Sequence, residues 1–118
     1  MELTVLGEVM GGRAAEAVML HLCHYGESYG RAIASDFGVT LYPIQRQLDK
    51  FEKAGVLVRK NHGKTVVFAW NAKSRFAKRM KSLVEVVYEG MSLEEREARF
   101  SVRRRPRSKD KPVIYSKS

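Results

Sequence analysis

Apolar residues in the first half of the chain recur at the three- and four-residue spacing that one face of an α-helix produces. Glycines at Gly11-Gly12 and at Gly26 interrupt this pattern. The spacing therefore predicts a central helix over residues 13–25, with the broad apolar face of a buried helix, and a short helix before it. The apolar positions of the short helix are Leu3, Leu6 and Met10.

The next helix is predicted over residues 29–37, followed by a tight turn. Ser28 belongs to the residue types that cap helix N-termini, and we expect it to cap this helix. Gly38 stands where a residue in the left-handed conformation would close the helix C-terminus. Val39 and Thr40 then lead into another helix.

This following helix, over residues 41–54, has an apolar stripe and a proline near its start. If Thr40 is the N-cap, Pro43 is the third helical residue, where a missing N–H costs little because first-turn N–H groups have no intrahelical acceptor. Gly55 is expected to end the helix. The residues of the stripe are Ile44, Leu48 and Phe51.

After Gly55 the apolar pattern changes from helical to extended. Residues 56–58 and 66–68 are rich in β-branched and aromatic side chains, and they flank a polar segment, residues 59–64, that contains Gly63. The pattern predicts a β-hairpin with a basic loop at its tip.

Helical spacing returns over residues 72–88, and Ser92 to Glu95 have the form of a capping box for a last helix over residues 93–100. The predicted fold is mainly α with a small β-hairpin. We divide the chain into an N-terminal helix or arm, a helix-turn-helix and hairpin core, C-terminal dimerisation helices and a basic flexible tail, over residues 1–12, 13–71, 72–100 and 101–118.

Charge narrows the choice of partner. The 118 residues carry a net charge of +9, which favours a polyanionic partner, either nucleic acid or an anionic membrane. Residues 101–118 hold seven Lys or Arg and one Asp, so their local charge is +6 and only +3 remains on residues 1–100. The charge of the whole chain therefore says little about the folded part, and the tail is expected to bind either DNA phosphates or a protein partner.

The cysteine content and the absence of long apolar runs indicate a cytoplasmic protein. Cys23 is the one cysteine of the sequence, so no intramolecular disulfide is possible. The first twelve residues lack the features of a signal peptide, and no run of 18 apolar residues occurs. We expect no membrane partner.

The stretch "YGRAIASDFGVTLYPIQRQLDKFEKAGVLVRKNHGKTVVFAWN", residues 29–71, resembles the winged helix-turn-helix core of small stand-alone transcriptional regulators of the ArsR and MarR-like groups. The resemblance implies binding of double-stranded DNA as a homodimer, in the role of a repressor, without a cofactor. The chain departs from the ArsR metal sensors in one respect, because the region of the predicted helix over residues 41–54 contains no paired cysteines. Metal-gated repression is therefore not expected.

In a winged helix, the helix over residues 41–54 would enter the major groove and the hairpin would lie on phosphates or in the minor groove. Arg46 suits guanine and Gln45 suits adenine. The residues expected to read bases are Tyr42, Pro43, Gln45, Arg46 and Asp49. Those expected to contact the DNA backbone are Thr40, Lys50, Arg59, Lys60, His62 and Lys64. The alternative is that these side chains form an ordinary solvated surface.

Apolar positions of the first and fifth predicted helices are candidates for a two-fold interface, since a lone winged helix has little room to bury them. The predicted interface residues are Leu6, Met10, Phe76, Met80, Leu83, Val84 and Val87. The alternative is that they pack entirely within their own domain.

Other functions have less support in the sequence. His21 and His24 lie one turn apart, but no paired carboxylate is evident and Cys23 points elsewhere, so we interpret them as ordinary hydrogen-bonded or surface histidines and expect no metal. Motifs for catalysis are lacking, so an enzyme is not expected. RNA binding is disfavoured, because no RNA-binding sheet motif is evident. The main alternative to DNA binding is a protein-interaction module, such as an antitoxin-like partner of a neighbouring enzyme.

Overall fold

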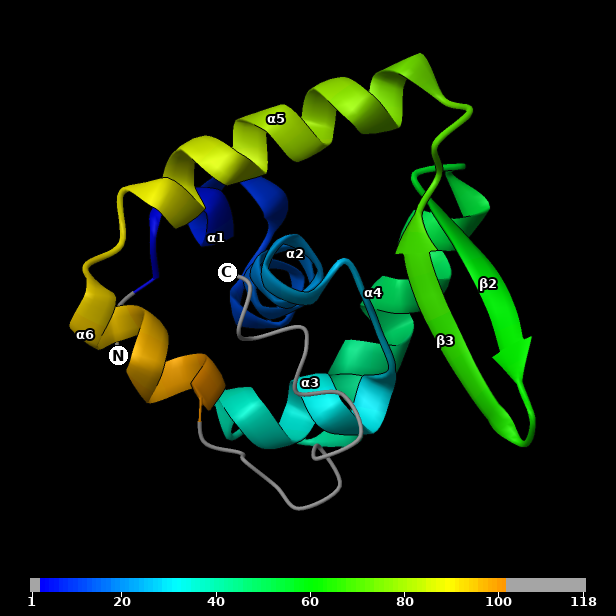
Figure 1. Cartoon of the computed structure of the whole chain (residues 1–118), viewed down its shortest axis with the longest axis horizontal. Helices are drawn as coiled ribbons and strands as arrows, with labels where there is room; N and C mark the ends of the chain where they lie inside the picture. The colour runs from blue at the N-terminus through cyan, green and yellow to red at the C-terminus, as the bar shows by residue number, and fades with distance from the viewer. Residues whose placement is uncertain (1–2, 102–118) are drawn as a thin grey trace.

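The computed structural model describes residues 3–101 (Figure 1). The described elements are α1 (Val5–Met10), α2 (Arg13–Tyr25), β1 (Glu27–Ser28), α3 (Gly30–Phe37), α4 (Leu41–Lys53), β2 (Leu57–His62), β3 (Thr65–Trp70), α5 (Arg75–Glu89), α6 (Leu93–Arg96) and the π-helix η1 (Glu97–Ser101). This is the predicted fold class, mainly helical with a small antiparallel sheet. The predicted basic tail lies outside the described residues from position 102 onward.

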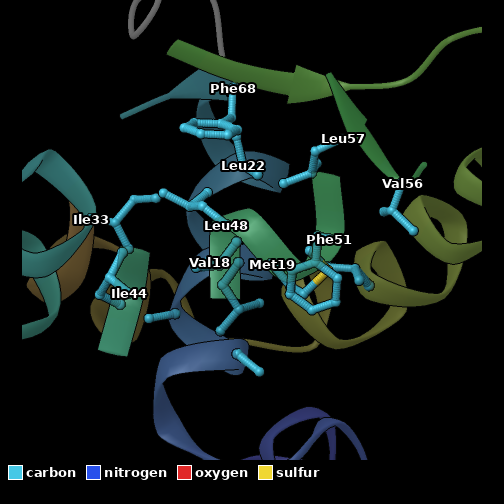
Figure 2. Packing of buried hydrophobic residues seen from close by; sticks show 14 of the residues in the cluster. Val18, Met19, Leu22, Ile33, Ile44, Leu48, Phe51, Val56, Leu57 and Phe68 are labelled. Carbon is cyan, nitrogen blue, oxygen red and sulfur yellow. The ribbon is translucent and has the colours of Figure 1, made fainter. Parts of the chain in front are cut away.

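Helix α2 is the centre of the domain (Figure 1). It contacts α1 and α5 on one side and α3 and α4 on the other, and all of residues 15–22 are buried. Apolar side chains from these helices and from the sheet interleave around it (Figure 2). Ten residues of this core are Val18, Met19, Leu22, Ile33, Ile44, Leu48, Phe51, Val56, Leu57 and Phe68.

Helices α3 and α4 are joined by the predicted tight turn. Gly38 is left-handed, with φ 64° and ψ 38°, and the N–H of Val39 donates to the carbonyl of Ala34 at 3.0 Å. Thr40 is the N-cap of α4 in an extended conformation, so Pro43 is the third helical residue. The predictions for this turn are confirmed.

Three antiparallel strands form the sheet, in the order β1-β3-β2. The prediction that Ser28 caps α3 is wrong, because Ser28 lies in β1, opposite Phe68 of β3, and Tyr29 is the N-cap. A two-residue strand is too short to produce an apolar alternation, so β1 was not evident in the sequence.

The hairpin is longer than predicted, and its loop is shorter. Strand β2 runs to His62, which pairs with Thr65, so the loop consists of residues 63 and 64 only. Gly63 takes the left-handed φ of 70° that this turn requires. Residues 59–62 were expected in a loop because they are polar, but the backbone ladder to β3 does not depend on apolar side chains.

A buried carboxylate that sequence reasoning missed holds α1 on α2. Glu16 is 3% exposed, and its Oε1 accepts hydrogen bonds from Thr4 N at 2.7 Å, Thr4 Oγ1 at 2.6 Å and Gly7 N at 3.2 Å. A Cβ on Gly7 would lie 2.7 Å from the same oxygen, so the close approach requires glycine. The position of α1 is therefore fixed by polar contacts as well as by Leu6.

The C-terminal helices differ from the prediction in their bounds. Helix α5 begins at Arg75 and not at residue 72, because Ser74 is its N-cap and accepts a hydrogen bond from Ala77 N at 3.0 Å. The capping box is confirmed, with Ser92 and Glu95 bonded to each other's backbone N–H groups. The expected helix over residues 93–100 is α-helical only to Arg96 and continues as η1.

The π-helical segment places Phe100 in the core. Phe100 is 1% exposed and stacks on His24, with ring centroids 4.2 Å apart and planes at 9°. Its carbonyl accepts a hydrogen bond from Tyr25 Oη at 2.7 Å. Ring contacts with Phe37 of α3 and Tyr88 of α5 complete the cluster. One side chain thus connects the C-terminal segment to three helices.

We expect the Phe100→Ala substitution to lower the free energy of unfolding by about 3–5 kcal/mol, because it removes a buried ring and leaves a cavity. Phe100→Leu should cost clearly less, since it keeps most of the apolar volume. Urea unfolding followed by circular dichroism measures both. An unchanged midpoint for the alanine variant would show that Phe100 is not packed among these rings.

Candidate nucleic-acid interface

The surface side of α4 is set by its buried stripe. Ile44 and Leu48 are fully buried against the core, which turns the intervening positions outward. Tyr42 is 69% exposed. Arg46, Asp49 and Lys50 are also exposed, whereas the other two predicted base-reading residues, Pro43 and Gln45, are partly covered. The structure therefore brings the predicted residues of α4 together on one side of the helix.

Close contact with α3 positions the first turns of α4. A Cβ on Gly30 would lie 2.9 Å from Gln45 Oε1 and 3.1 Å from Leu41 Cδ1, so a larger residue there would push these two side-chain ends aside. Gln45 Nε2 donates to Asp49 Oδ1 at 3.3 Å, one turn further along. The amide of Gln45 is thus already oriented by its neighbours.

Arg46 and Tyr42 form an exposed pair one turn apart on α4. The guanidinium carbon of Arg46 lies 5.8 Å from the centroid of the Tyr42 ring. Stacking of this kind is weak at an exposed site, but it uses the face of the guanidinium and keeps its N–H edge available for hydrogen bonding. An edge presented in this way is suited to the two acceptors of a guanine in a major groove.

The predicted cations of the hairpin are not equivalent. Arg59 binds Glu52 of α4, with Nη2 to Oε1 at 2.9 Å, and approaches Asp49 Oδ1 at 3.4 Å. These hydrogen bonds raise the pKa of Arg59. Lys60 Nζ lies 3.1 Å from Glu27 Oε1 of β1. Two residues predicted to contact the DNA backbone therefore have carboxylate partners within the domain.

The remaining residues predicted to contact the DNA backbone are exposed. Thr40 lies at the start of α4, while His62 and Lys64 lie at the end of the hairpin. The hairpin lies beside α4 and projects from the domain (Figure 1). Spacing along the sequence could not distinguish these residues from Arg59 and Lys60. The carboxylate partner of Arg59 lies 7 positions away and that of Lys60 lies 33 positions away.

The predicted dimer residues fall into two groups. Leu6 and Val84 are 3% and 0% exposed, so their side chains belong to the core of the chain and not to its surface. Met10, Met80 and Val87 are partly buried against the core. The exposed apolar residues of α5 and α1, which we call the α1–α5 apolar face, are Phe76, Leu83, Val86, Val5 and Val9. Of these five, Val5, Val9 and Val86 were not predicted.

The two histidines have separate partners. His21 is buried, and its Nε2 lies 2.7 Å from Asp36 Oδ2, a carboxylate that the sequence did not reveal. His24 Nδ1 lies 2.6 Å from Tyr88 Oη. Within residues 3–101, no group of three or more His, Cys, Asp or Glu side chains is placed to hold a metal ion. Both histidines are therefore hydrogen-bonded within the domain.

Burial changes the acid–base behaviour of this cluster. It lowers the pKa of His24 to about 4, with further lowering from His21 and Arg96 and a small opposing effect of Asp36. Burial also raises the pKa of the Cys23 thiol to about 11, with Glu85 acting in the same direction. A thiol with so high a pKa is unreactive at neutral pH.

One solved structure similar to this chain is the NMR structure of a homodimeric winged helix-turn-helix DNA-binding domain from Mycobacterium bovis, part of a possible ArsR-family transcriptional regulator. The sequences are 21% identical, the match covers 71% of this chain and 75% of that chain, and the TM-score is 0.50. The similarity shows that this chain has a winged helix-turn-helix fold. No protein-family model and no curated protein matches the sequence.

Helix lengths bear on the membrane alternative. Among the described residues, no helix is both long enough and apolar enough to cross a membrane.

Acid should destabilise the protein through His24. Its pKa rises from about 4 in the folded state to an unfolded value of 6.5, so the unfolded state binds more protons between these values. The contribution of neutral His24 is complete above pH 6.5 and is lost as the pH falls towards 4. Since the ring is partly solvated, the slope should stay below about 1.4 kcal/mol per pH unit.

Urea unfolding of the wild type and of His24→Gln between pH 7 and pH 4 tests this expectation. The wild type should lose more stability than the variant over this range. His62→Gln is the matched control, because it removes a histidine from an exposed position on the hairpin. Parallel pH curves for the wild type and His24→Gln would contradict the burial of a neutral His24.

Proposed function

We propose that this protein binds double-stranded DNA in a sequence-specific manner, as a homodimeric transcriptional repressor that acts by occupying an operator. Helix α4 would enter the major groove, and the β2–β3 hairpin would contact phosphates or the minor groove. The observation that carries the proposal is the surface of α4. Tyr42, Arg46 and Lys50 project from a helix whose other side is anchored in the core, with an exposed hairpin beside it.

The side chains on α4 suggest a division of roles. Arg46 would donate to a guanine, and Gln45, already bonded to Asp49, would reach an adenine only through the part of its amide that remains uncovered. Tyr42 would contact a thymine methyl group or the sugar-phosphate backbone. Lys50, His62 and Lys64 would bind phosphates, which fixes the position of the protein without reading sequence.

The α1–α5 apolar face supports a homodimer. Phe76, Leu83 and Val86 are 67%, 57% and 68% exposed and lie within one side of α5 by helical spacing. A second copy related by a two-fold axis would cover them and would present two α4 helices to half-sites about one DNA turn apart. The similar Mycobacterium bovis domain is homodimeric, which is consistent with this arrangement.

The alternative function, a protein-interaction module, is favoured by the same apolar face, since a different protein could cover it. The two proposals differ in their use of α4. Only DNA binding requires the exposed side of α4 and the hairpin to be accessible together. In both cases the protein acts by binding and not as an enzyme.

Substitution of Arg46 tests the proposal directly. Loss of a bidentate contact with guanine should weaken specific binding by about 5- to 150-fold, corresponding to about 1–3 kcal/mol, and should weaken binding to a scrambled duplex less. Fluorescence anisotropy with a duplex from the upstream region of the protein's own gene, across a salt series, measures both. Lys78→Ala is the control, because Lys78 is an exposed cation on α5 that points away from the side formed by Phe76, Leu83 and Val86. Equal binding of both duplexes by wild type and by Arg46→Ala would overturn sequence-specific reading.

Charge placed on the apolar face should disrupt the dimer. Sedimentation equilibrium at micromolar concentration should show a dimer for the wild type and a monomer for the double variant Phe76→Glu/Leu83→Glu, because two buried charges per copy would be unpaired. Leu93→Glu is the matched control, since Leu93 is 67% exposed on α6, outside this face. A monomeric wild type would contradict the dimer.

A further inference from the structure

We propose that Arg59 is a positioning residue of the α4–hairpin surface, which fixes the hairpin on α4 and neutralises two carboxylates there, and that it does not contact phosphate. The functional consequence of this role rests on the proposed DNA binding. The sequence pattern alone had placed Arg59 among the residues that contact the DNA backbone.

Contacts of Arg59 join three elements. Its Nε donates to both carboxylate oxygens of Glu52, at 3.3 and 3.2 Å, and its Nη2 donates to Oε1 at 2.9 Å. The guanidinium carbon lies 5.1 Å from the centroid of Phe68, the residue opposite Arg59 across the β2–β3 ladder. Phe68 is itself 1% exposed. The guanidinium is thus held by α4 at its edge and by β3 at its face.

Two acidic residues of α4 explain how Arg59 would affect the charge of this surface. Asp49 and Glu52 lie three residues apart on α4, and both lie within 3.4 Å of Arg59 Nη2. Without Arg59, these two carboxylates would be uncompensated on the same helix as Tyr42 and Arg46. Helix α4 has three basic and two acidic residues, so the two carboxylates cancel most of its positive charge. Neutralisation by Arg59 restores an attractive surface.

A phosphate that bound the Nε or Nη2 group of Arg59 would have to displace the hydrogen bonds to Glu52 that these groups already make. Lys64, in contrast, lies in the exposed hairpin loop. We therefore expect the effects of removing Arg59 and Lys64 on DNA affinity to depend differently on Glu52. Removal of Arg59 should cost most while Glu52 is charged and less when only Asp49 remains, whereas removal of Lys64 should cost the same affinity with or without the charge of Glu52.

A double-mutant cycle on DNA affinity tests the proposal, using Arg59→Gln, Glu52→Gln and the double variant. We expect Arg59→Gln to weaken binding about tenfold in the wild-type background and less than about threefold in the Glu52→Gln background. If Arg59 instead contacts phosphate, Glu52→Gln frees it, and the loss in that background would be as large or larger. That result would overturn the proposal. Lys64→Gln in both backgrounds is the matched control.

A second measurement separates this proposal from the proposed function. Backbone amide dynamics of residues 60–65, measured by 15N relaxation in the free protein, should show increased hairpin mobility in Arg59→Gln and in Glu52→Gln, but not in Lys64→Gln. Arg59→Lys, which keeps the charge but loses the planar fork, should also increase it. An unchanged hairpin in Arg59→Gln would overturn the positioning role. If the wild type binds no duplex, the DNA-binding proposal fails, and the mobility result still decides the structural role of Arg59.

Discussion

Packing of the apolar stripe of α4 against α2 is the interaction on which the rest of the surface depends. Ile44 and Leu48 have no exposed area, so α4 cannot rotate without losing its core contacts. That constraint decides which residues of α4 face outward, and Gly30 of α3 leaves room for the side chains of Gln45 and Leu41 beside them. The proposed interface therefore lies on a rigid element, and the side chains that would meet DNA are positioned by residues that never touch it.

The helices and the turn between α3 and α4 could be predicted from sequence because each has a local signal. Glycines mark the ends of α1, α2 and α3, and Ser92 and Glu95 form a capping box. Strand β1 and the outer half of the hairpin lack such signals, because backbone pairing across the sheet leaves no pattern in two residues or in a polar run. The spacing of apolar residues and the residues that mark helix ends therefore account for most of the fold.

The contacts that distinguish one site residue from another were beyond sequence reasoning. Arg59 and Lys64 look alike in the sequence, because both are basic residues of one hairpin. Among the ion pairs of the described residues, however, carboxylates of α4 contact Arg59 and not Lys64. In the same way, His21 gains Asp36 from α3, 15 residues away, and Phe100 gains an aromatic cluster from three helices. Each partnership depends on tertiary placement, which composition and periodicity do not encode.

Charge on this protein is divided between places with different roles. Most of the net charge of +9 lies beyond residue 100, where it can attract a polyanion from a distance, since long-range attraction depends on total charge and not on geometry. On α4 and the hairpin, residues 41–70 carry six Lys or Arg and two acidic residues, a local charge of +4, and both carboxylates contact Arg59. Such a surface would also attract phosphates, so the choice of one DNA sequence would depend on the fit of particular side chains. In the proposed function, a specific site would be favoured by contacts made at short range, and a basic tail without such contacts would add affinity for any sequence equally.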